Sequence, residues 1–307
     1  MPYFVEEFSF PSATEVAHIH AKLYMPQAPN AVVQLAHGMA EHMGRYHDFA
    51  AYLAHAGIAV ALHDHAGHGK SMGEGYPGGY FGAQNGWSNL VADMKTLHGS
   101  VAARCNGLPY VLMGHSMGSF LTRTYASRHG GGIAAFILMG TAGKNPALGV
   151  GRAVAGLELA RNGEKSPSTL LRTMSFGTYN KAFAPNRTNN DWLTRDHAVV
   201  DAYENDPQCG FAFTAEGMRD LFDGLTEISS KQWAAQVPHA PILLLSGSED
   251  PVGGKGAGGV KQVYNWLIST GHTVTLRLYE GARHELLNEI NRDEVYGDIL
   301  RYIQSVI

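Results

Sequence analysis

The chain has 307 residues, of which 45% are hydrophobic and 16% charged, enough apolar material for one large α/β domain or for one with an insertion. Its net charge is −4 and it has no basic run, so it lacks the electrostatic footprint of a nucleic-acid-binding protein. The first residues do not resemble a signal peptide, which has a basic start and an apolar run, and no stretch of eighteen apolar residues occurs. The two cysteines, Cys105 and Cys209, do not have the spacing of a metal site. We therefore expect a cytoplasmic protein.

Strands and helices alternate along the first part of the chain. Tyr3–Phe10 and Ala17–Met25 predict two strands of an antiparallel hairpin at a sheet edge, joined by the turn at residues 11–14. Short apolar runs predict further strands at Asn30–Ala36, Ile58–Leu62, Tyr110–Met113 and Ile133–Met139. Apolar residues at helical spacing lie between them, at residues 46–53, 87–101 and 117–125.

The alternation stops between about residues 142 and 230. That segment carries helical patterns, such as the spacing of Met218, Leu221 and Leu225, but no convincing strand. The alternation then resumes with strands at Pro241–Ser246 and Thr273–Tyr279 and helices around residues 260–267 and 292–306. We predict an α/β fold with an eight-stranded, mostly parallel sheet, helices on both faces, a core of residues 1–141 and 231–307, and an inserted helical cap of residues 142–230.

A G-x-S-x-G pattern spans residues 114–118, between a predicted strand and a predicted helix. A serine at such a junction sits on a strained turn, and the flanking glycines remove the Cβ atoms that would collide there. The helix that begins beside the serine directs free N–H groups toward any oxyanion that forms near it. We predict Ser116 as a catalytic nucleophile.

A second G-x-S-x-G pattern, at residues 69–73, contains Ser71. It is followed by the glycine-rich stretch GEGYPGGYFG, which cannot form the helix that such a turn requires. We therefore take Ser71 as the weaker candidate.

A serine nucleophile needs a histidine that is oriented by a carboxylate. In open α/β sheets these groups come from loops at the carboxyl ends of strands, and two such loops carry Asp250 and His284. The order Ser116, Asp250, His284 is that of α/β-hydrolases. Glu249 is the alternative acid, and Asp250 is also a typical turn residue before Pro251.

Backbone N–H groups are predicted to bind the oxyanion. One comes from the residue after the nucleophile, Met117, and the other most plausibly from Met39, in the loop after an earlier strand. The Met39 side chain could pack in the core or line the pocket without affecting its N–H.

Three histidines, His63, His65 and His68, crowd the loop that follows the strand at residues 58–62. Their spacing matches no zinc pattern, so a polar loop is favoured over a metal site. Cys209 is not evidence for catalysis. No metal and no cofactor are implied.

The decapeptide HGMAEHMGRY at residues 37–46 resembles the HG-x-x-EH-x-x-RY signature of the monoacylglycerol lipase and lysophospholipase family of α/β-hydrolases, which is serine aminopeptidase S33-like. DHAGHGKS at residues 64–71, GHSMGS at 114–119 and NDP at 205–207 resemble further motifs of that family. The resemblance covers the chain from residue 36 to 285. It implies an α/β-hydrolase fold, a triad of Ser116, Asp250 and His284, and oxyanion donors at Met39 and Met117.

By the same resemblance, Glu41 and Arg45 form an ion pair near the glycerol end of the pocket, where Glu41 either contacts substrate or scaffolds the loop. The implied activity is hydrolysis of carboxylic esters through an acyl-serine intermediate. The implied substrates are monoacylglycerols, lysophospholipids or small acyl and aryl esters, with transient contact to a lipid or micelle surface. An aminopeptidase, an acyltransferase and a non-catalytic ligand-binding protein are the alternatives.

The predicted cap differs from that family in the stretches SFGTYNKAF and APNRTNNDWLTRD, and Arg283 stands where a more neutral residue is expected. Substrate identity therefore stays open. Apolar cap residues are expected to roof an acyl pocket: Leu148, Leu157, Leu170, Met174, Phe176 and Phe183.

Overall fold

The computed structural model describes residues 1–14, 18–73, 75–105 and 107–307. Its strands are β1 (Tyr3–Phe10), β2 (Ile19–Pro26), β3 (Ala31–Ala36), β4 (Ile58–His63), β5 (Tyr110–His115), β6 (Ala135–Met139), β7 (Ile242–Gly247) and β8 (Val274–Tyr279). These are the eight strands predicted from the sequence, with ends that differ by one or two residues. Ala17, the predicted start of the second strand, lies outside the described residues.

One sheet contains all eight strands, in the order β1-β2-β4-β3-β5-β6-β7-β8. β1 and β2 form the predicted antiparallel hairpin at one edge, and β2 also runs antiparallel to β4. The remaining neighbours are parallel. Parallel neighbours place the carboxyl ends of β3 to β8 at one edge, so the loops that leave them can meet there.

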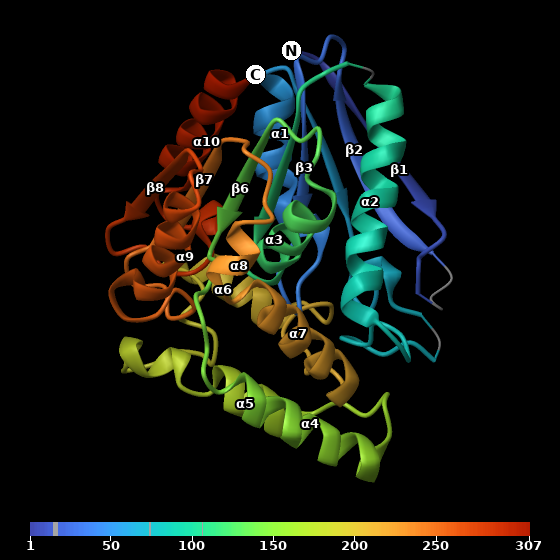
Figure 1. The fold of residues 1–307 in the computed structure, drawn as a ribbon, viewed down its shortest axis with the longest axis vertical. Coiled ribbons are helices and arrows are strands. Elements are labelled where there is room, and N and C mark those ends of the chain that lie inside the picture. The colour runs from blue at the N-terminus through green and yellow to red at the C-terminus, as the bar shows by residue number, and fades with distance from the viewer. Residues whose placement is uncertain (15–17, 74, 106) are drawn as a thin grey trace.

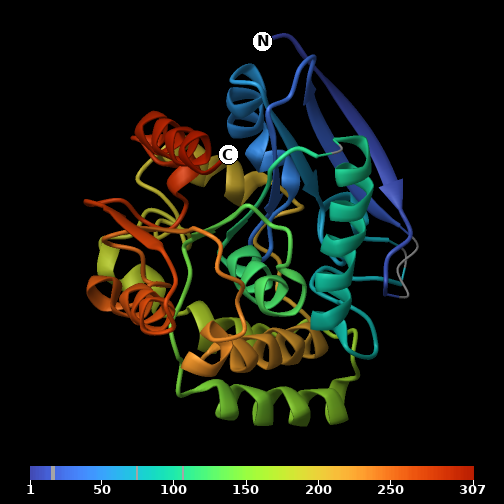
Figure 2. The same cartoon turned by 45° about the horizontal axis from the view of Figure 1, so that its top comes forward.

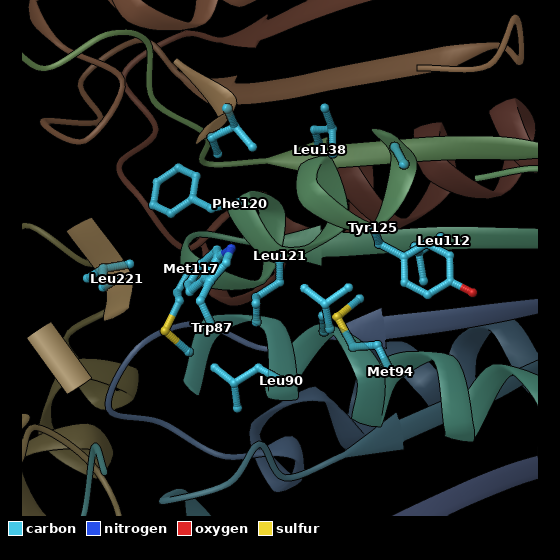
Figure 3. Close-up of a cluster of buried hydrophobic side chains, with 14 of the residues drawn as sticks. Trp87, Leu90, Met94, Leu112, Met117, Phe120, Leu121, Tyr125, Leu138 and Leu221 are labelled. Atoms are coloured by element: carbon cyan, nitrogen blue, oxygen red, sulfur yellow. The ribbon is translucent and has the colours of Figure 1, made fainter. Parts of the chain in front are cut away.

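Helices cover both faces of the sheet (Figure 1). They are α1 (His47–His55), α2 (Gly86–Arg104), α3 (Met117–His129), α9 (Gly258–Ser269) and α10 (Arg292–Val306). In β5, Val111 and Met113 pack toward α1 and α10, whereas Leu112 packs toward α2 and α3. This alternation buries β5 on both sides, which explains why its sequence is a continuous apolar run. Figure 3 shows the α2 side of this packing, with Leu112 near Met94 and Tyr125.

Residues 142–230 form helices, as predicted. They are α4 (Leu148–Asn162), α5 (Thr169–Phe176), the 3₁₀ turn η3 (Tyr179–Phe183), α6 (His197–Asn205) and α7 (Ala215–Ile228). Helix α7 packs against α2 and α3, and α4 packs on the outside of α7 (Figure 2). A short helix, α8 (Lys231–Ala234), leads back to the sheet. No helix in the described ranges is long and apolar enough to cross a membrane.

Arg123 of α3 ties down both ends of this helical segment. Its buried guanidinium donates to the Ala142 carbonyl at 2.8 Å and to the Ile228 carbonyl at 2.6 Å. It also lies 4.3 Å from the centre of the Trp233 ring, whose indole N–H donates to the Arg123 carbonyl. Because one buried guanidinium donates to both carbonyls, the two ends of the segment are held beside the helix that follows Ser116.

Candidate active site

Ser116 occupies a strained turn between β5 and α3. Its backbone angles are φ +53° and ψ −121°, a region that side chains other than glycine rarely adopt. The Ser116 N–H donates to the Met139 carbonyl of β6 at 2.9 Å, and its own carbonyl accepts from Ser119 and Phe120 in the first turn of α3. The backbone is therefore held from both sides, which allows the strained angles to persist.

The two flanking glycines are required by contact with the backbone. A Cβ on Gly114 would lie 2.1 Å from the Gly118 carbonyl oxygen, and a Cβ on Gly118 would lie 2.0 Å from that of Ala36 in β3. Neither backbone group can move away as the tip of a flexible side chain could. The pattern G-x-S-x-G thus reflects a helix that begins in direct contact with its own strand and with the neighbouring one.

Ser71 lies in a different setting. It ends the short 3₁₀ turn η2 (Gly69–Ser71), and its side chain is buried. Its hydroxyl donates to the Asp64 carbonyl at 2.9 Å and accepts from the His20 N–H at 3.0 Å. These bonds attach the loop after β4 to strand β2, and Ser71 lines neither of the cavities described below.

His284 and Asp250 meet at the carboxyl edge of the sheet. Nδ1 of His284 lies 3.0 Å from each carboxylate oxygen of Asp250, and both side chains are buried. Glu249, the alternative acid, is exposed to solvent. Asp250 also accepts the Val252 N–H at 2.9 Å, so it shapes the turn as well as holding the imidazole. With Nδ1–H directed at Asp250, Nε2 is the nitrogen left to accept a proton.

Glycine allows His284 to approach the elbow. A Cβ on Gly140, after β6, would lie 3.0 Å from Cε1 of His284. Gly140 also has φ +61°, so both space and backbone favour glycine there. His284 and Ser116 line the same cavity. The structure thus brings together the three residues of the predicted triad, whose catalytic roles stay a prediction.

The backbone N–H groups of Met39 and Met117 have no hydrogen-bond acceptor in the described parts of the chain. Met117 is the first residue of α3, where N–H groups have no partner within the helix. Met39 precedes Ala40, which has φ +52° and donates its N–H to His68 Nε2 at 3.3 Å. The Met117 side chain packs in the core near Trp87 and Leu221 (Figure 3).

Four buried histidines support the loop that carries Met39. His37 Nε2 accepts the His65 N–H at 3.0 Å, and neither ring nitrogen of His63 has a hydrogen-bond partner among the described residues. Burial lowers the pKa of His63 and of His68 to about 3, and it holds the pKa values of His37 and His65 well below the usual range. Neutral rings are the form in which His37 and His68 can accept backbone N–H groups.

Another set of polar side chains lies close together: Nε2 of His42, the Asp206 carboxylate and the buried Cys209 thiol are within 4.8 Å of one another. His42 Nε2 contacts Asp206 at 2.9 Å, and its Nδ1 accepts the Gly44 N–H at 3.1 Å. Burial raises the pKa of the Cys209 thiol, which disfavours the thiolate that a metal would require. The contact instead connects the predicted NDP motif of residues 205–207 to the loop after β3.

Arg45 joins two carboxylates beneath the site. Its guanidinium donates to Glu41 at 2.7 Å and to Glu285 at 2.6 and 2.7 Å. The predicted Glu41–Arg45 ion pair is therefore present. The second partner of Arg45, Glu285, was not predicted from the sequence, although its position directly after His284 could have indicated it. Glu41 also accepts the Gly38 N–H at 2.5 Å, so this group links the Met39 loop to the His284 loop.

His115 directly precedes Ser116 in the elbow, and its pKa is shifted by a neighbouring carboxylate. Burial would lower its pKa, but the hydrogen bond and negative charge of Glu41 raise it above the usual value. Its Nδ1 lies 3.3 Å from Glu41, and its Nε2 lies 3.3 Å from the His284 carbonyl, which can only accept. The Tyr46 hydroxyl, which donates to Glu41, lies 2.9 Å from the same Nδ1. Both ring nitrogens therefore have acceptors nearby, an arrangement that favours the protonated ring.

Two cavities meet at Ser116. One, of about 420 Å³, runs under α4, α5 and α7 and is lined mainly by apolar side chains, among them Leu148, Met174, Phe222 and Leu225. The other, of about 380 Å³, is lined by polar groups of the segment 172–190 together with Glu41, His284 and Glu285. Ser116, Met39 and Phe176 line both. Both volumes are typical of small-molecule sites.

Aromatic rings cover His284 on the cavity side. The Trp192 ring lies 5.1 Å from the imidazole, and Tyr179 contacts Trp192 edge-on at 5.1 Å. Arg283 fixes this arrangement, because it donates to the carbonyls of Asp191 and Thr194 on either side of Trp192. The unexpected arginine before His284 thus positions the loop over it.

The apolar roof predicted from the sequence is partly different. Leu148, Met174 and Phe176 line the apolar cavity, but Leu157 and Leu170 are 73% and 51% exposed and face outward. Phe183 lies under the Arg283 guanidinium, 4.1 Å from it, and lines neither cavity. Periodicity marked the apolar residues of α4 and α5 but not which of them point inward, because that depends on how the helices pack on α7.

A model of the family described as Serine aminopeptidase, S33 (Hydrolase_4) matches residues 27–291. The chain belongs to this family. Among S33-like relatives, the monoacylglycerol lipase of Mycolicibacterium smegmatis is 31% identical over 280 residues, covering 90% of this chain and 89% of the relative. The monoglyceride lipase of Homo sapiens is 28% identical over 265 residues, covering 85% and 78%.

The solved structure of a highly thermostable carboxyl esterase from Bacillus coagulans superposes on this S33 member with a TM-score of 0.92. It is 32% identical and covers 98% of both chains. The α/β-hydrolase fold predicted from the sequence is therefore confirmed. By family and relatives, the protein is a hydrolase of the carboxylesterase and monoacylglycerol lipase group.

Proposed function

We propose that this protein is a serine hydrolase that cleaves monoacyl carboxylic esters through an acyl-enzyme on Ser116. The observation that carries this proposal is that Ser116 stands where an apolar cavity and a polar cavity meet, beside the hydrogen-bonded pair of His284 and Asp250. An ester of a fatty acid with a polar alcohol has the same two-sided character. The apolar cavity suits the acyl chain, and the polar cavity suits the alcohol.

The chemistry would proceed in two halves. The Ser116 hydroxyl attacks the ester carbonyl while His284 Nε2 takes its proton, and the N–H groups of Met39 and Met117 bind the oxyanion. Collapse of this intermediate releases the alcohol, which receives the proton from His284. Water then attacks the acyl-serine while His284 again takes a proton. This second intermediate breaks its bond to Ser116, His284 returns the proton to the serine oxygen, and the carboxylic acid is released.

We further propose that residues 142–230 act as a cap that determines the acyl chain. Its helices supply most of the apolar wall, and Arg123 holds both its ends next to α3. The names of the relatives, a monoacylglycerol lipase and an esterase solved in complex with glycerol, support an alcohol of the glycerol type.

An aminopeptidase is less well supported, although the family carries that description. An aminopeptidase must bind the charged amino terminus of a peptide, usually through a free carboxylate. The carboxylates lining the two cavities in the described structure are Glu41 and Glu285, and both are hydrogen-bonded to Arg45.

Labelling of Ser116 by a fluorophosphonate separates the catalytic proposals from a silent ligand-binding protein, which would not react.

A series of p-nitrophenyl esters from acetyl to palmitoyl tests the cap. Each added methylene contributes about 0.8 kcal/mol when buried, so kcat/KM should rise a few-fold per carbon until the cavity is full and then level or fall. Phe176→Ala removes a wall of the cavity and should flatten that rise. Leu157→Ala, an exposed cap residue, is the matched control and should follow the wild type. A flat wild-type profile, or one unchanged by Phe176→Ala, would show that the cap does not bind the acyl chain there.

A further inference from the structure

The wall of the polar cavity includes two cationic residues. Arg172 of α5 and Lys181 of η3 both line this cavity together with Ser116 and His284. Within the described structure, neither charged group forms an ion pair or a side-chain hydrogen bond. Arg172 is half-buried, whereas Lys181 is exposed. A guanidinium that is partly withdrawn from water usually has a carboxylate or carbonyl partner.

Other arginines of residues 142–230 are paired. Arg152 contacts Asp223 at 2.7 Å, Arg195 contacts Glu289 at 2.9 Å, Arg187 contacts Asp201, and Arg219 contacts Glu216. Arg161 has no ion-pair partner in the described ranges either, but it is exposed at the end of α4 and lines neither cavity. Arg172 therefore differs from the other arginines of residues 142–230, because it lines the cavity and has no ion-pair partner among the described residues.

The negative groups of the same wall are partly neutralised by one arginine. Glu41 and Glu285 share Arg45, which balances one of their two charges. Together with Arg172 and Lys181, the wall then has an excess of about one positive charge by this count. An additional neutral donor is available, since the Asn189 carboxamide lines the cavity and makes no side-chain hydrogen bond in the described structure.

We propose that Arg172 and Lys181 form a binding subsite for an anionic group on the alcohol side of the ester. The inference rests on the proposed function, in which the polar cavity holds the alcohol. Two cations and an amide suit a phosphate, which offers several oxygens and up to two negative charges. The favoured substrate class is then a monoacyl ester of a phosphate-bearing glycerol, rather than the neutral monoacylglycerol.

A pair of matched esters tests this subsite directly. 1-Decanoylglycerol and 1-decanoylglycerol 3-phosphate carry the same acyl chain and differ only in the phosphate. With both below their micelle concentrations, release of decanoate gives kcat/KM for each. We expect the wild type to favour the phosphate ester by at least about 10-fold, and Arg172→Gln or Lys181→Gln to lower that ratio roughly 10-fold, as for a lost charge-assisted hydrogen bond.

Arg161→Gln is the control, because it removes a cap arginine that does not line either cavity. It should leave the ratio as in the wild type. Raising the salt concentration should lower the wild-type ratio by screening and leave the neutral ester little changed. Glycerol 3-phosphate should inhibit competitively at a lower concentration than glycerol or inorganic phosphate. That ranking would show that the subsite recognises a phosphate attached to the alcohol rather than free phosphate.

A wild-type ratio of one or less, or a ratio unchanged in Arg172→Gln and Lys181→Gln, overturns the subsite. Equal inhibition by inorganic phosphate and glycerol 3-phosphate also counts against it, since the alcohol would then play no part. These failures differ from failure of the proposed function: if Ser116 reacts with a fluorophosphonate and the neutral ester is hydrolysed, only the anionic subsite is lost.

Discussion

Ser116 and Ser71 share the same five-residue pattern, but their surroundings differ in every respect that matters for chemistry. Ser116 lies between a buried strand and a thirteen-residue helix, with φ +53°. Ser71 ends a three-residue 3₁₀ turn, and its hydroxyl both donates and accepts a hydrogen bond within the fold. One serine lines two cavities, whereas the other joins a loop to β2.

The comparison shows that a glycine in such a pattern indicates a tight strand–helix junction only where a Cβ at its position would collide with neighbouring backbone. A Cβ on Gly118 meets the Ala36 carbonyl oxygen at 2.0 Å, whereas a Cβ on Gly73 has nothing within 4 Å in the described structure. In the first loop glycine is required because a helix starts against two strands. In the second, the last glycine lies at the surface.

The largest effect should come from the two serines themselves. Ser116→Ala should remove ester hydrolysis by a factor on the order of 10⁴–10⁶, because no nucleophile remains. Ser71→Ala should leave a folded, largely active enzyme with reduced stability from two lost hydrogen bonds. Hydrolysis of p-nitrophenyl butyrate measures the first, and urea unfolding the second. Substantial activity in the Ser116 variant would remove the distinction between the two loops.

The second comparison concerns the carboxylate that serves Ser116. Asp250→Asn keeps the shape but favours the wrong tautomer of His284, so kcat should fall by on the order of 10³–10⁴. Glu249→Gln, at an exposed neighbouring position, should cost far less. Steady-state kinetics on the same ester decide between them, and the opposite ranking would assign the acid to Glu249.

The glycines provide a matched pair for stability. Gly118→Ala should lower the free energy of unfolding by at least about 3 kcal/mol, because the new methyl group collides with backbone that cannot shift. Gly73→Ala should change it by no more than about 0.5 kcal/mol. Chemical denaturation of both variants at neutral pH measures the difference, and equal stabilities would contradict the close contact between α3 and β3.

The smallest expected effect is a pH dependence in the loop that leads to Ser71. Burial lowers the pKa of His63 to about 3, so between pH 6.5 and 3 the unfolded chain binds a proton that the folded chain does not. Stability is full above pH 6.5 and falls by about 1.4 kcal/mol per pH unit below it for this residue. His63→Leu removes that part of the slope. Urea unfolding at pH 7, 6 and 5 should show it, and parallel curves for the variant and wild type would refute it.

His115, beside Ser116, has the opposite sign. Its pKa is raised by Glu41, so the stability it contributes is present at low pH and is lost as pH rises through the raised value. The strand end that leads to the Ser71 loop thus carries a histidine whose pKa is lowered by burial, whereas the histidine before Ser116 has a pKa raised by Glu41.

Local sequence determined the sheet and much of the site. Apolar runs such as residues 110–113 specify buried strands, because a strand covered on both faces needs no polar side. The loops after β7 and β8 place Asp250 and His284 at the edge where the parallel strands end. The roles of Glu285, Trp192 and Arg283 could not be predicted in this way, since their partners lie far away in the sequence.

What the sequence by itself determined about this protein is therefore its alternation of elements, the strand–turn–helix at Ser116 and the order of the predicted triad residues, because each depends on neighbours within a few positions. Only the tertiary structure decided which apolar residues of α4 and α5 face inward, which carboxylates share Arg45, and that Arg172 lines a cavity without a side-chain partner among the described residues. These features depend on how helices pack against one another, and that packing is a property of the whole chain.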